Sequence, residues 1–284
     1  MKAANPESTT DAFLQLTARR YLEVVALVAI WMVIGRSLRL DANAYLLVGV
    51  PLLVVFQSYV RRSPLSQLWV DGVAFALSRR GWMLAAALAV WPGYKLLSAI
   101  RSGDGLAINL WLIAATVGAV FAAFAFSEQC RRGKTSKLRE AALLLVVGCG
   151  VYALSAFLAG RSPLLHPPTL LFVAGQFLLY LPVVFVLEEV VFRGAVDSHI
   201  SFGAVAGARA WTSALFSGAL WGLWHLPILP DVTLPTAVSV VIFHAGFGAP
   251  LALLRRTTGT LALPGLVHAA MDAYRNGLFL APAS

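Results

Sequence analysis

The sequence is poor in charged residues and in cysteine, and each shortage excludes a class of protein. Only 12% of the 284 residues are charged, whereas soluble domains have about 25%, so an ordinary soluble domain is excluded. The two cysteines, Cys130 and Cys149, show no CxxC spacing, which argues against a disulfide framework or a cysteine metal site. The chain also lacks HExxH, Gly-x-Ser-Gly and Gly-x-Gly-Asp motifs. Zincin, rhomboid-type and presenilin-type proteases are therefore not supported.

The chain is rich in long apolar runs. Hydrophobic residues make up 59% of the chain, and the mean hydropathy is +0.78. Runs of about 20 apolar residues, enough for a helix to cross a bilayer, recur along the sequence. These runs are continuous, whereas the strands of a membrane β-barrel alternate in pieces of about ten residues. We therefore predict an all-α fold, a polytopic membrane helix bundle with eight or nine transmembrane helices.

The predicted spans follow the apolar runs. They cover about 21–38, 43–60, 81–100, 106–127, 141–160, 168–192, 209–229, 233–254 and 259–280. The segment 63–80 contains Pro64, Asp71 and Arg79–Arg80. It is too polar to span and is expected to lie at the membrane interface.

The net charge of +9 reflects membrane topology, and no nucleic-acid partner is expected. Basic residues cluster in short loops, as the positive-inside rule requires. With a cytoplasmic N-terminus, the basic groups expected inside are Arg61–Arg62, Arg79–Arg80, Arg255–Arg256 and the cluster Arg131, Arg132, Lys134, Lys137 and Arg139. Arg36, Arg39, Arg101 and Arg161 are expected outside. We predict an integral, multi-pass membrane protein, in the cytoplasmic (inner) membrane if it is bacterial.

The chain changes character near Arg161. Before it, charges keep to the loops; after it, acids and histidines fall within or at the ends of apolar runs. We predict two parts: residues 1–160 as a scaffold of N-terminal transmembrane helices, and residues 161–284 as a catalytic helical core.

Two adjacent acids, Glu188 and Glu189, end the longest uncharged stretch of that core. A charge within a membrane span is costly, roughly 2.5–3.5 kcal/mol on insertion scales, so it needs a partner or a function. In a helix, Glu189 and Arg193 share a face four residues apart. Glu188 points about 100° away and lacks that partner. Glu189 and Arg193 are thus predicted to be structural, and Glu188 to be free for chemistry.

Three histidines follow in the next apolar runs. His225 ends a run and shares a helix face with Trp221, although an aromatic belt with a capping histidine explains this pair equally well. His268 and Asp272 are also four residues apart, a spacing that suits a carboxylate-held histidine or two ligands of one ion. His244 has no polar neighbour on its face. It either packs in the bundle, which we favour, or joins the site.

Together these residues predict hydrolysis of an amide bond within the membrane. A buried glutamate can take a proton from water as a general base, while imidazoles orient the water and stabilise the oxyanion. The cofactor is none or one divalent metal such as zinc; a metal would take ligands from His225, His268, Asp272 and Glu188. The alternatives are a proton-coupled transporter, a haem protein with histidine ligands and a non-catalytic membrane partner protein.

The order of the motifs resembles a known family. Glu-Glu-x-x-x-Arg at 188–193, aromatic-x-x-x-His at 221–225 and His-x-x-x-Asp at 268–272 are similar to the motifs of CPBP (CaaX protease and bacteriocin-processing) intramembrane proteases. That family includes type II CaaX prenyl endopeptidases and bacterial Abi-type proteins. The resemblance covers about 165–275. It implies a helical membrane enzyme, glutamate-based or metal-dependent, with a cavity open towards the cytoplasm.

The resemblance also implies a role for each residue. Glu188 and His225 would activate water, His268 and Asp272 would complete the pocket and steady the oxyanion, and Glu189 with Arg193 would brace the helix. The substrate would be a peptide or a lipidated, membrane-anchored protein. Two positions depart from the family pattern, since Trp221 stands where Phe is common and Asp272 where Asn is frequent. An acid at 272 would be the better cation ligand.

Overall fold

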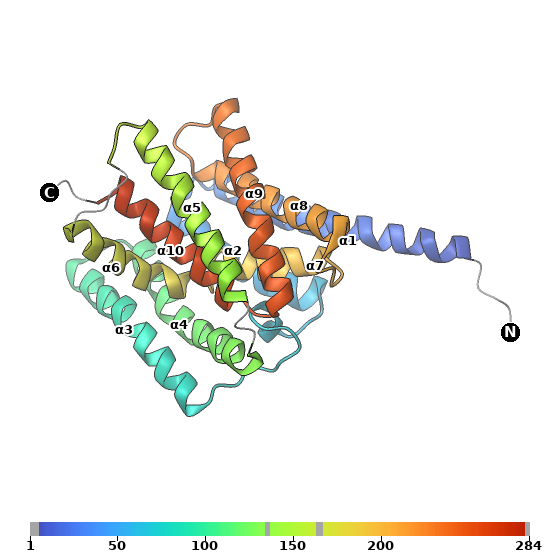
Figure 1. Cartoon of the computed structure of the whole chain (residues 1–284), viewed down its shortest axis with the longest axis horizontal. Helices are drawn as coiled ribbons and strands as arrows, with labels where there is room; N and C mark the ends of the chain where they lie inside the picture. The colour runs from blue at the N-terminus through green and yellow to red at the C-terminus, as the bar shows by residue number, and fades with distance from the viewer. Residues whose placement is uncertain (1–5, 134–136, 163–166, 282–284) are drawn as a thin grey trace.

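The computed structural model describes residues 6–133, 137–162 and 167–281, which fold almost entirely into helices (Figure 1). Lys134 of the predicted basic loop lies outside the described residues. The α-helices are α1 (Pro6–Ser37), α2 (Ala42–Val55), α3 (Arg79–Ser102), α4 (Leu106–Arg132), α5 (Leu138–Leu158), α6 (Pro167–Val183), α7 (Ser198–Ile200), α8 (Gly207–His225), α9 (Leu234–Thr258) and α10 (Ala262–Phe279). Short π or 3-10 segments are η1 (Phe56–Val60), η2 (Leu65–Leu68), η4 (Val190–Asp197) and η5 (Leu226–Ile228). The described residues contain no strand, and the predicted all-α helical bundle is confirmed.

Five described stretches are long and apolar enough to cross a membrane. They are Ala42–Val60, Arg79–Ser102, Leu106–Arg132, Leu138–Leu158 and Leu234–Thr258. The apolar part of α6, Thr169–Val183, is shorter, and α1, α8 and α10 are not among the five. On α5, Leu143 and Val146 are 63% and 68% exposed, as a lipid-facing surface requires. The total of eight or nine spans stays a prediction.

Helices α8 and α9 lie side by side because glycines allow their backbones to touch. A Cβ atom at Gly218 would lie 2.7 Å from His244 O, and one at Gly222 would lie 2.6 Å from Val241 Cα. Small residues four apart are the usual means by which membrane helices approach closely. This contact brings the face of α8 that carries Trp221 and His225 against His244.

The predicted span 168–192 is not one continuous helix. Pro182 lies near the end of α6, and it has no N–H to donate to the preceding turn. The chain then tightens, with Phe185 N bonded to Pro182 O and Val186 N to Val183 O, before widening into the π-helix η4. Trp69 Nε1 donates to the freed Phe185 O at 2.5 Å. The break places Glu188 and Glu189 in different surroundings.

The segment 63–80 differs in part from the prediction. Its later residues 74–76 are exposed, but Leu68, Trp69 and Val70 are buried in the bundle. Val70 forms an isolated bridge with Thr260, and Arg255 binds the carboxylate of Asp71. Asp71, one of the polar residues that argued against a span, thus anchors the segment to α9.

The N-terminal helices pack onto the C-terminal ones through aromatic side chains. Tyr45 Oη donates to Trp224 O at 2.7 Å, and Trp31 Nε1 donates to Tyr45 O at 2.7 Å. The rings of Trp31 and Trp224 meet edge to face. One hydrophobic core therefore joins α1, α2 and α8 and fixes α8 from the side opposite α9.

Candidate active site

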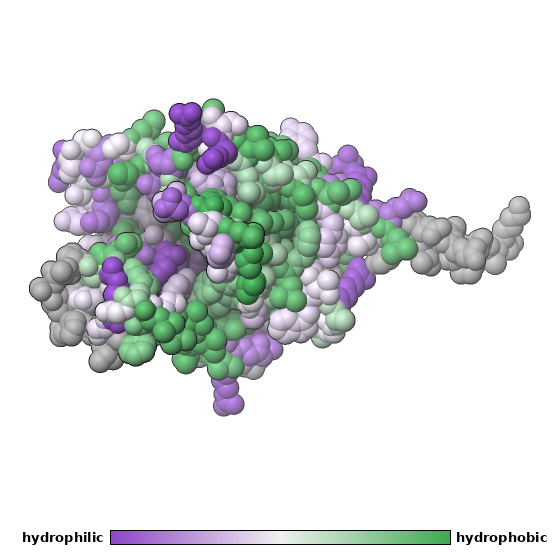
Figure 2. All heavy atoms as spheres, turned by 90° about the horizontal axis from the view of Figure 1, so that it is seen from above, coloured by the Kyte–Doolittle hydropathy of each residue, from purple (hydrophilic) through white to green (hydrophobic). Residues whose placement is uncertain are grey.

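A cavity of about 250 Å³ lies between α2, α4, α5, α6, α8, α9 and α10. Seen from above, the molecule has a hollow whose wall shows hydrophilic atoms among hydrophobic surface (Figure 2). The acidic and basic residues that line the cavity are Glu188, His225, His244, His268, Asp272 and Arg275. Apolar and aromatic side chains make up most of the rest, which is typical of a ligand-binding pocket.

Glu188 is the centre of this polar group. Its Oε2 atom accepts a hydrogen bond from Trp221 Nε1 at 3.0 Å. The same oxygen lies 3.7 Å from His225 Nε2 and 3.9 Å from His268 Nε2. These two distances are too long for direct hydrogen bonds. Glu188 is thus held on one side and free on the other, and its side chain is 16% exposed.

Backbone carbonyls fix two of the histidine rings. His225 Nδ1 lies 2.9 Å from Trp221 O, and His244 Nδ1 lies 2.7 Å from Val240 O. A carbonyl only accepts, so Nδ1 carries the proton in both rings and each Nε2 keeps a lone pair. The two rings are neighbours, with centroids 4.3 Å apart. His244 therefore lines the cavity as well as packing against α8.

A buried, charged cluster lies behind this cavity. Glu189 is 0% exposed and Arg193 is 1% exposed, and they form an ion pair of 3.0 Å between Oε1 and Nη1. The same Oε1 accepts a hydrogen bond from His268 Nδ1 at 2.8 Å. The guanidinium of Arg193 lies 3.9 Å above the ring of Trp221. Glu189 thus holds the imidazole of His268 in addition to pairing with Arg193.

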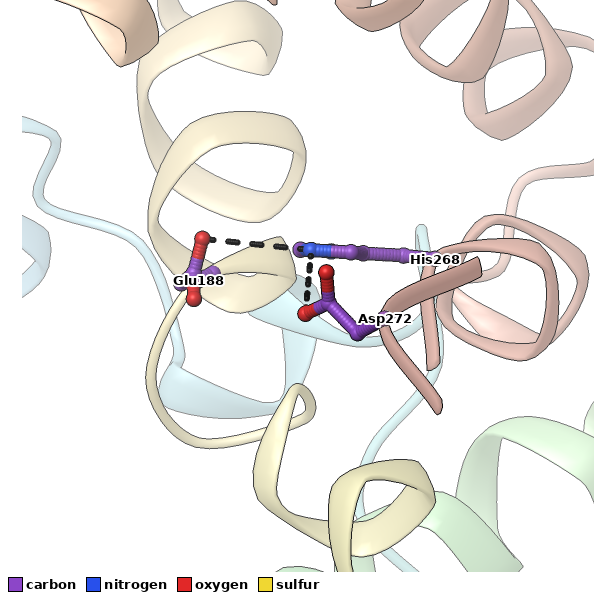
Figure 3. Close-up of side chains that lie close together, drawn as sticks. All are labelled: Glu188, His268 and Asp272. Atoms are coloured by element: carbon purple, nitrogen blue, oxygen red, sulfur yellow. Dashed lines mark ion pairs between the residues drawn. The ribbon is translucent and has the colours of Figure 1, made fainter. Parts of the chain in front are cut away.

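The Nε2 atom of His268 faces two carboxylates. It lies 3.3 Å from Asp272 Oδ2 and 3.9 Å from Glu188 Oε2. The dashed lines in Figure 3 mark these two ion pairs. Arg275 Nη1 binds the other oxygen of Asp272 at 3.1 Å. His268 Nδ1 donates its proton to Glu189, so the lone pair of a neutral ring would be at Nε2, facing the carboxylates of Asp272 and Glu188. A positive charge at Nε2 would remove this repulsion. A proton on Nε2 or a bound cation would supply it.

The donor set fits a divalent cation. Ligand atoms of Glu188, His268 and Asp272 all lie within 4.8 Å of one another. Two carboxylates and an imidazole are a ligand set that zinc and similar metals accept, and three protein ligands leave a position open for water. The hydrogen bond from His268 Nδ1 to Glu189 is also the usual support of a metal-bound histidine.

The structure brings all predicted site residues into one region. Glu188, Trp221, His225, His268 and Asp272 line the cavity, and Glu189 with Arg193 lies directly behind it. His225 is the one predicted metal ligand outside the close three-residue set. Its Nε2 nevertheless faces Glu188.

Two features escaped the sequence analysis. Arg275 lines the cavity and pairs with Asp272, and its signal was present, because the two lie three residues apart in the last apolar run. The contact between Glu189 and His268 joins helices 79 residues apart in the chain. No local pattern could have indicated it.

Comparison with known proteins agrees with the motif resemblance. Residues 169–274 match the model of a family described as "type II CAAX prenyl endopeptidase Rce1-like". The matched segment runs from α6 into α10 and contains every residue predicted for the site. The family resemblance is thereby confirmed for this segment. Neither a curated protein nor a solved structure matches the chain.

Proposed function

We propose that this protein, through its Rce1-like segment, is an intramembrane endopeptidase with Glu188 as its general base. Its substrate would be a membrane-associated protein or a C-terminal tail. A prenylated CaaX tail is one such substrate, named by the family description. The proposal rests on one observation above all: Glu188 is a carboxylate oriented by Trp221 but left unbonded towards two imidazoles in a cavity.

The 3.7 Å separation allows one water molecule beside Glu188 and His225 to contact both. Glu188 Oε2 and His225 Nε2 are both acceptors 3.7 Å apart, so they share a donor rather than bond each other. Glu188 takes a proton from this water, and the hydroxide oxygen bonds to the scissile carbonyl carbon. The C–N bond then breaks, and the proton held by Glu188 passes to the leaving amine. His268, held by Glu189, steadies the oxyanion in its protonated form.

A metal would use much of the same set. Glu188, His268 and Asp272 would hold it, and Glu189 would orient His268. The ion would polarise the substrate carbonyl and lower the cost of forming hydroxide. Glu188 would then serve as a ligand, and His225 Nε2 would be the remaining proton acceptor next to it.

Substitution of the base tests the proposal. Purified wild-type protein and Glu188→Gln are incubated with a farnesylated CaaX peptide and with membrane-anchored tail peptides, and products are identified by mass spectrometry. We expect Glu188→Gln to lower cleavage by at least about 100-fold, with unchanged folding. Glu128→Gln is the matched control, because Glu128 pairs with Arg131 on α4, away from the cavity. Equal cleavage by Glu188→Gln and wild type would rule out Glu188 as the base.

A further inference from the structure

Arginines from distant parts of the chain gather at one end of the bundle. Arg61 Nη1 donates to Gly194 O, Arg20 Nη1 donates to His199 O, and Arg256 binds the carboxylate of Asp197. Arg255 binds the Asp71 carboxylate, and Arg132 Nη2 donates to Asp71 O. These contacts lie at or near the C-terminal ends of η1, α4, η4 and α9, and near the middle of the long helix α1. We refer to this as the basic end.

The cavity opens at the other end. Ala42 and Asn43 line it at the first turn of α2, and Ile228 lines it just beyond α8. Ala42 is exposed. From Ala42 to Arg61 the chain runs 19 residues as helix, roughly 28 Å at 1.5 Å per residue. That length is close to the hydrocarbon thickness of a bilayer, about 30 Å.

Other residues that line the cavity also lie near the ends of helices that are opposite the basic end. Trp111 lies near the start of α4, whose opposite end carries Arg132. Tyr152 lies near the end of α5, which starts after the basic loop. In each helix, the residue that reaches the cavity mouth lies far from the basic end.

Towards the basic end the cavity is closed. Leu68 and Phe185 are 1% and 0% exposed, and Trp69 Nε1 bonds Phe185 O across the gap left by the break in α6. The backbone of Leu68 is pressed against Gly194, where a Cβ would lie 2.3 Å from Leu68 O. The buried pair Glu189–Arg193 belongs to the same layer. Access from this side would require these packed residues to separate.

Positive charge marks the cytoplasmic side of membrane proteins, because Lys and Arg flanking the spans are retained there. We propose that the cavity opens to the extracytoplasmic side and that peptide substrates enter from that side. A cytoplasmic basic end, which the charge pattern predicts, and a cytoplasmic mouth, which the family resemblance implies, are incompatible in this fold. The substrates are then membrane-anchored segments exposed outside the cytoplasm, such as tails or juxtamembrane stretches of exported proteins. This substrate class rests on the proposed function; the side of access does not.

Cysteine labelling in intact bacterial cells tests the access side. In a background with Cys130→Ser and Cys149→Ala, we introduce Ala42→Cys at the mouth or Arg80→Cys at the start of α3, beyond the basic end. A membrane-impermeant charged maleimide is added before or after permeabilisation. We expect Ala42→Cys to react in intact cells and Arg80→Cys only after permeabilisation. Reaction of Arg80→Cys in intact cells, or of Ala42→Cys only after permeabilisation, would overturn the proposal.

A second reporter covers the case in which Ala42→Cys fails to fold or to react. Leu106→Cys begins α4 at the same end as the mouth and is 74% exposed in the native protein; it should behave as Ala42→Cys does. The labelling needs no activity, so it separates the access side from the protease function. In sealed vesicles of known orientation, a tail peptide added outside should then be cleaved only where the mouth faces out. Extracytoplasmic labelling without such cleavage would retain the access side and count against peptide hydrolysis.

Discussion

The two sides of the Glu188–Glu189 peptide bond form opposite kinds of site. On the side of Glu189, Oε1 makes a hydrogen bond of 2.8 Å to His268 and an ion pair of 3.0 Å with Arg193, and all three residues are buried. On the side of Glu188, only Trp221 is at bonding distance, and the imidazoles stand off at 3.7 and 3.9 Å. Two chemically identical neighbours therefore have different roles: Glu189 is buried and paired through its Oε1 atom, and Glu188 keeps free capacity for a substrate.

Trp221 connects the two regions. Its ring is covered by Arg193 of the closed cluster, and its Nε1 donates to Glu188 of the open chamber. A fixed charge behind the ring thus fixes the orientation of the proposed base in front of it. Substitutions in either region test this comparison. Those in the buried Glu189–Arg193 cluster should lower the free energy of unfolding most.

The largest effect is expected in the closed cluster. Glu189→Ala or Arg193→Ala leaves one buried charge without its partner, and each should lower the free energy of unfolding by about 3–5 kcal/mol. The measurement is equilibrium unfolding in detergent, with Glu188→Gln as the reference. A loss below about 1 kcal/mol in both variants would contradict a closed, paired cluster.

A double replacement sharpens this result. Glu189→Leu with Arg193→Leu removes both charges together, and it should recover part of the lost stability. Cleavage should stay low even in the folded double variant, because His268 has lost the acceptor of its Nδ1 proton. Recovery of cleavage with stability would mean that Glu189 only braces the helix.

Loss of the hydrogen bond from Trp221 to Glu188 should have an intermediate effect, and it should lower activity more than stability. Trp221→Phe keeps an aromatic ring over Arg193 but removes the hydrogen bond to Glu188. Hydrogen bonds to charged groups contribute about 1.5–3 kcal/mol, so kcat should fall by roughly 10- to 150-fold with little loss of stability. Trp224→Phe is the matched control, because the buried Trp224 Nε1 makes no hydrogen bond within the described residues. Equal activity of Trp221→Phe and Trp224→Phe would dismiss the orienting role.

Much of this arrangement was predictable because it depends on local spacing. The four-residue intervals Glu189–Arg193, Trp221–His225 and His268–Asp272 placed each pair on one face, and each pair makes a contact or lines one cavity in the structure. The apolar runs likewise predicted where most helices lie. Local periodicity holds in a membrane bundle because every backbone group must be satisfied within its own helix.

What could not be predicted depends on contacts between distant segments. The break after Pro182 was hidden inside an apolar run, and the partner of Glu189 was a histidine on another helix. The burial of residues 68–70 was also missed, since their polar neighbours find partners, such as Arg255 for Asp71, only in the folded bundle. The side on which the cavity opens follows from all these contacts together, and no single motif encodes it.

The smallest effects are expected at Asp272 and Arg275, and they should have opposite signs. Asp272→Asn removes one of two carboxylate ligands and should weaken zinc binding to metal-stripped protein by about tenfold or more. Arg275→Gln removes a cation that competes for Asp272 and should strengthen zinc binding severalfold. Because Arg275 is 39% exposed, its loss should cost less than about 1 kcal/mol of stability. Isothermal titration with zinc measures both variants against Glu128→Gln. Identical affinities in all three would show that Glu188, His268 and Asp272 hold no metal, and that His268 Nε2 carries a proton between the two acids instead.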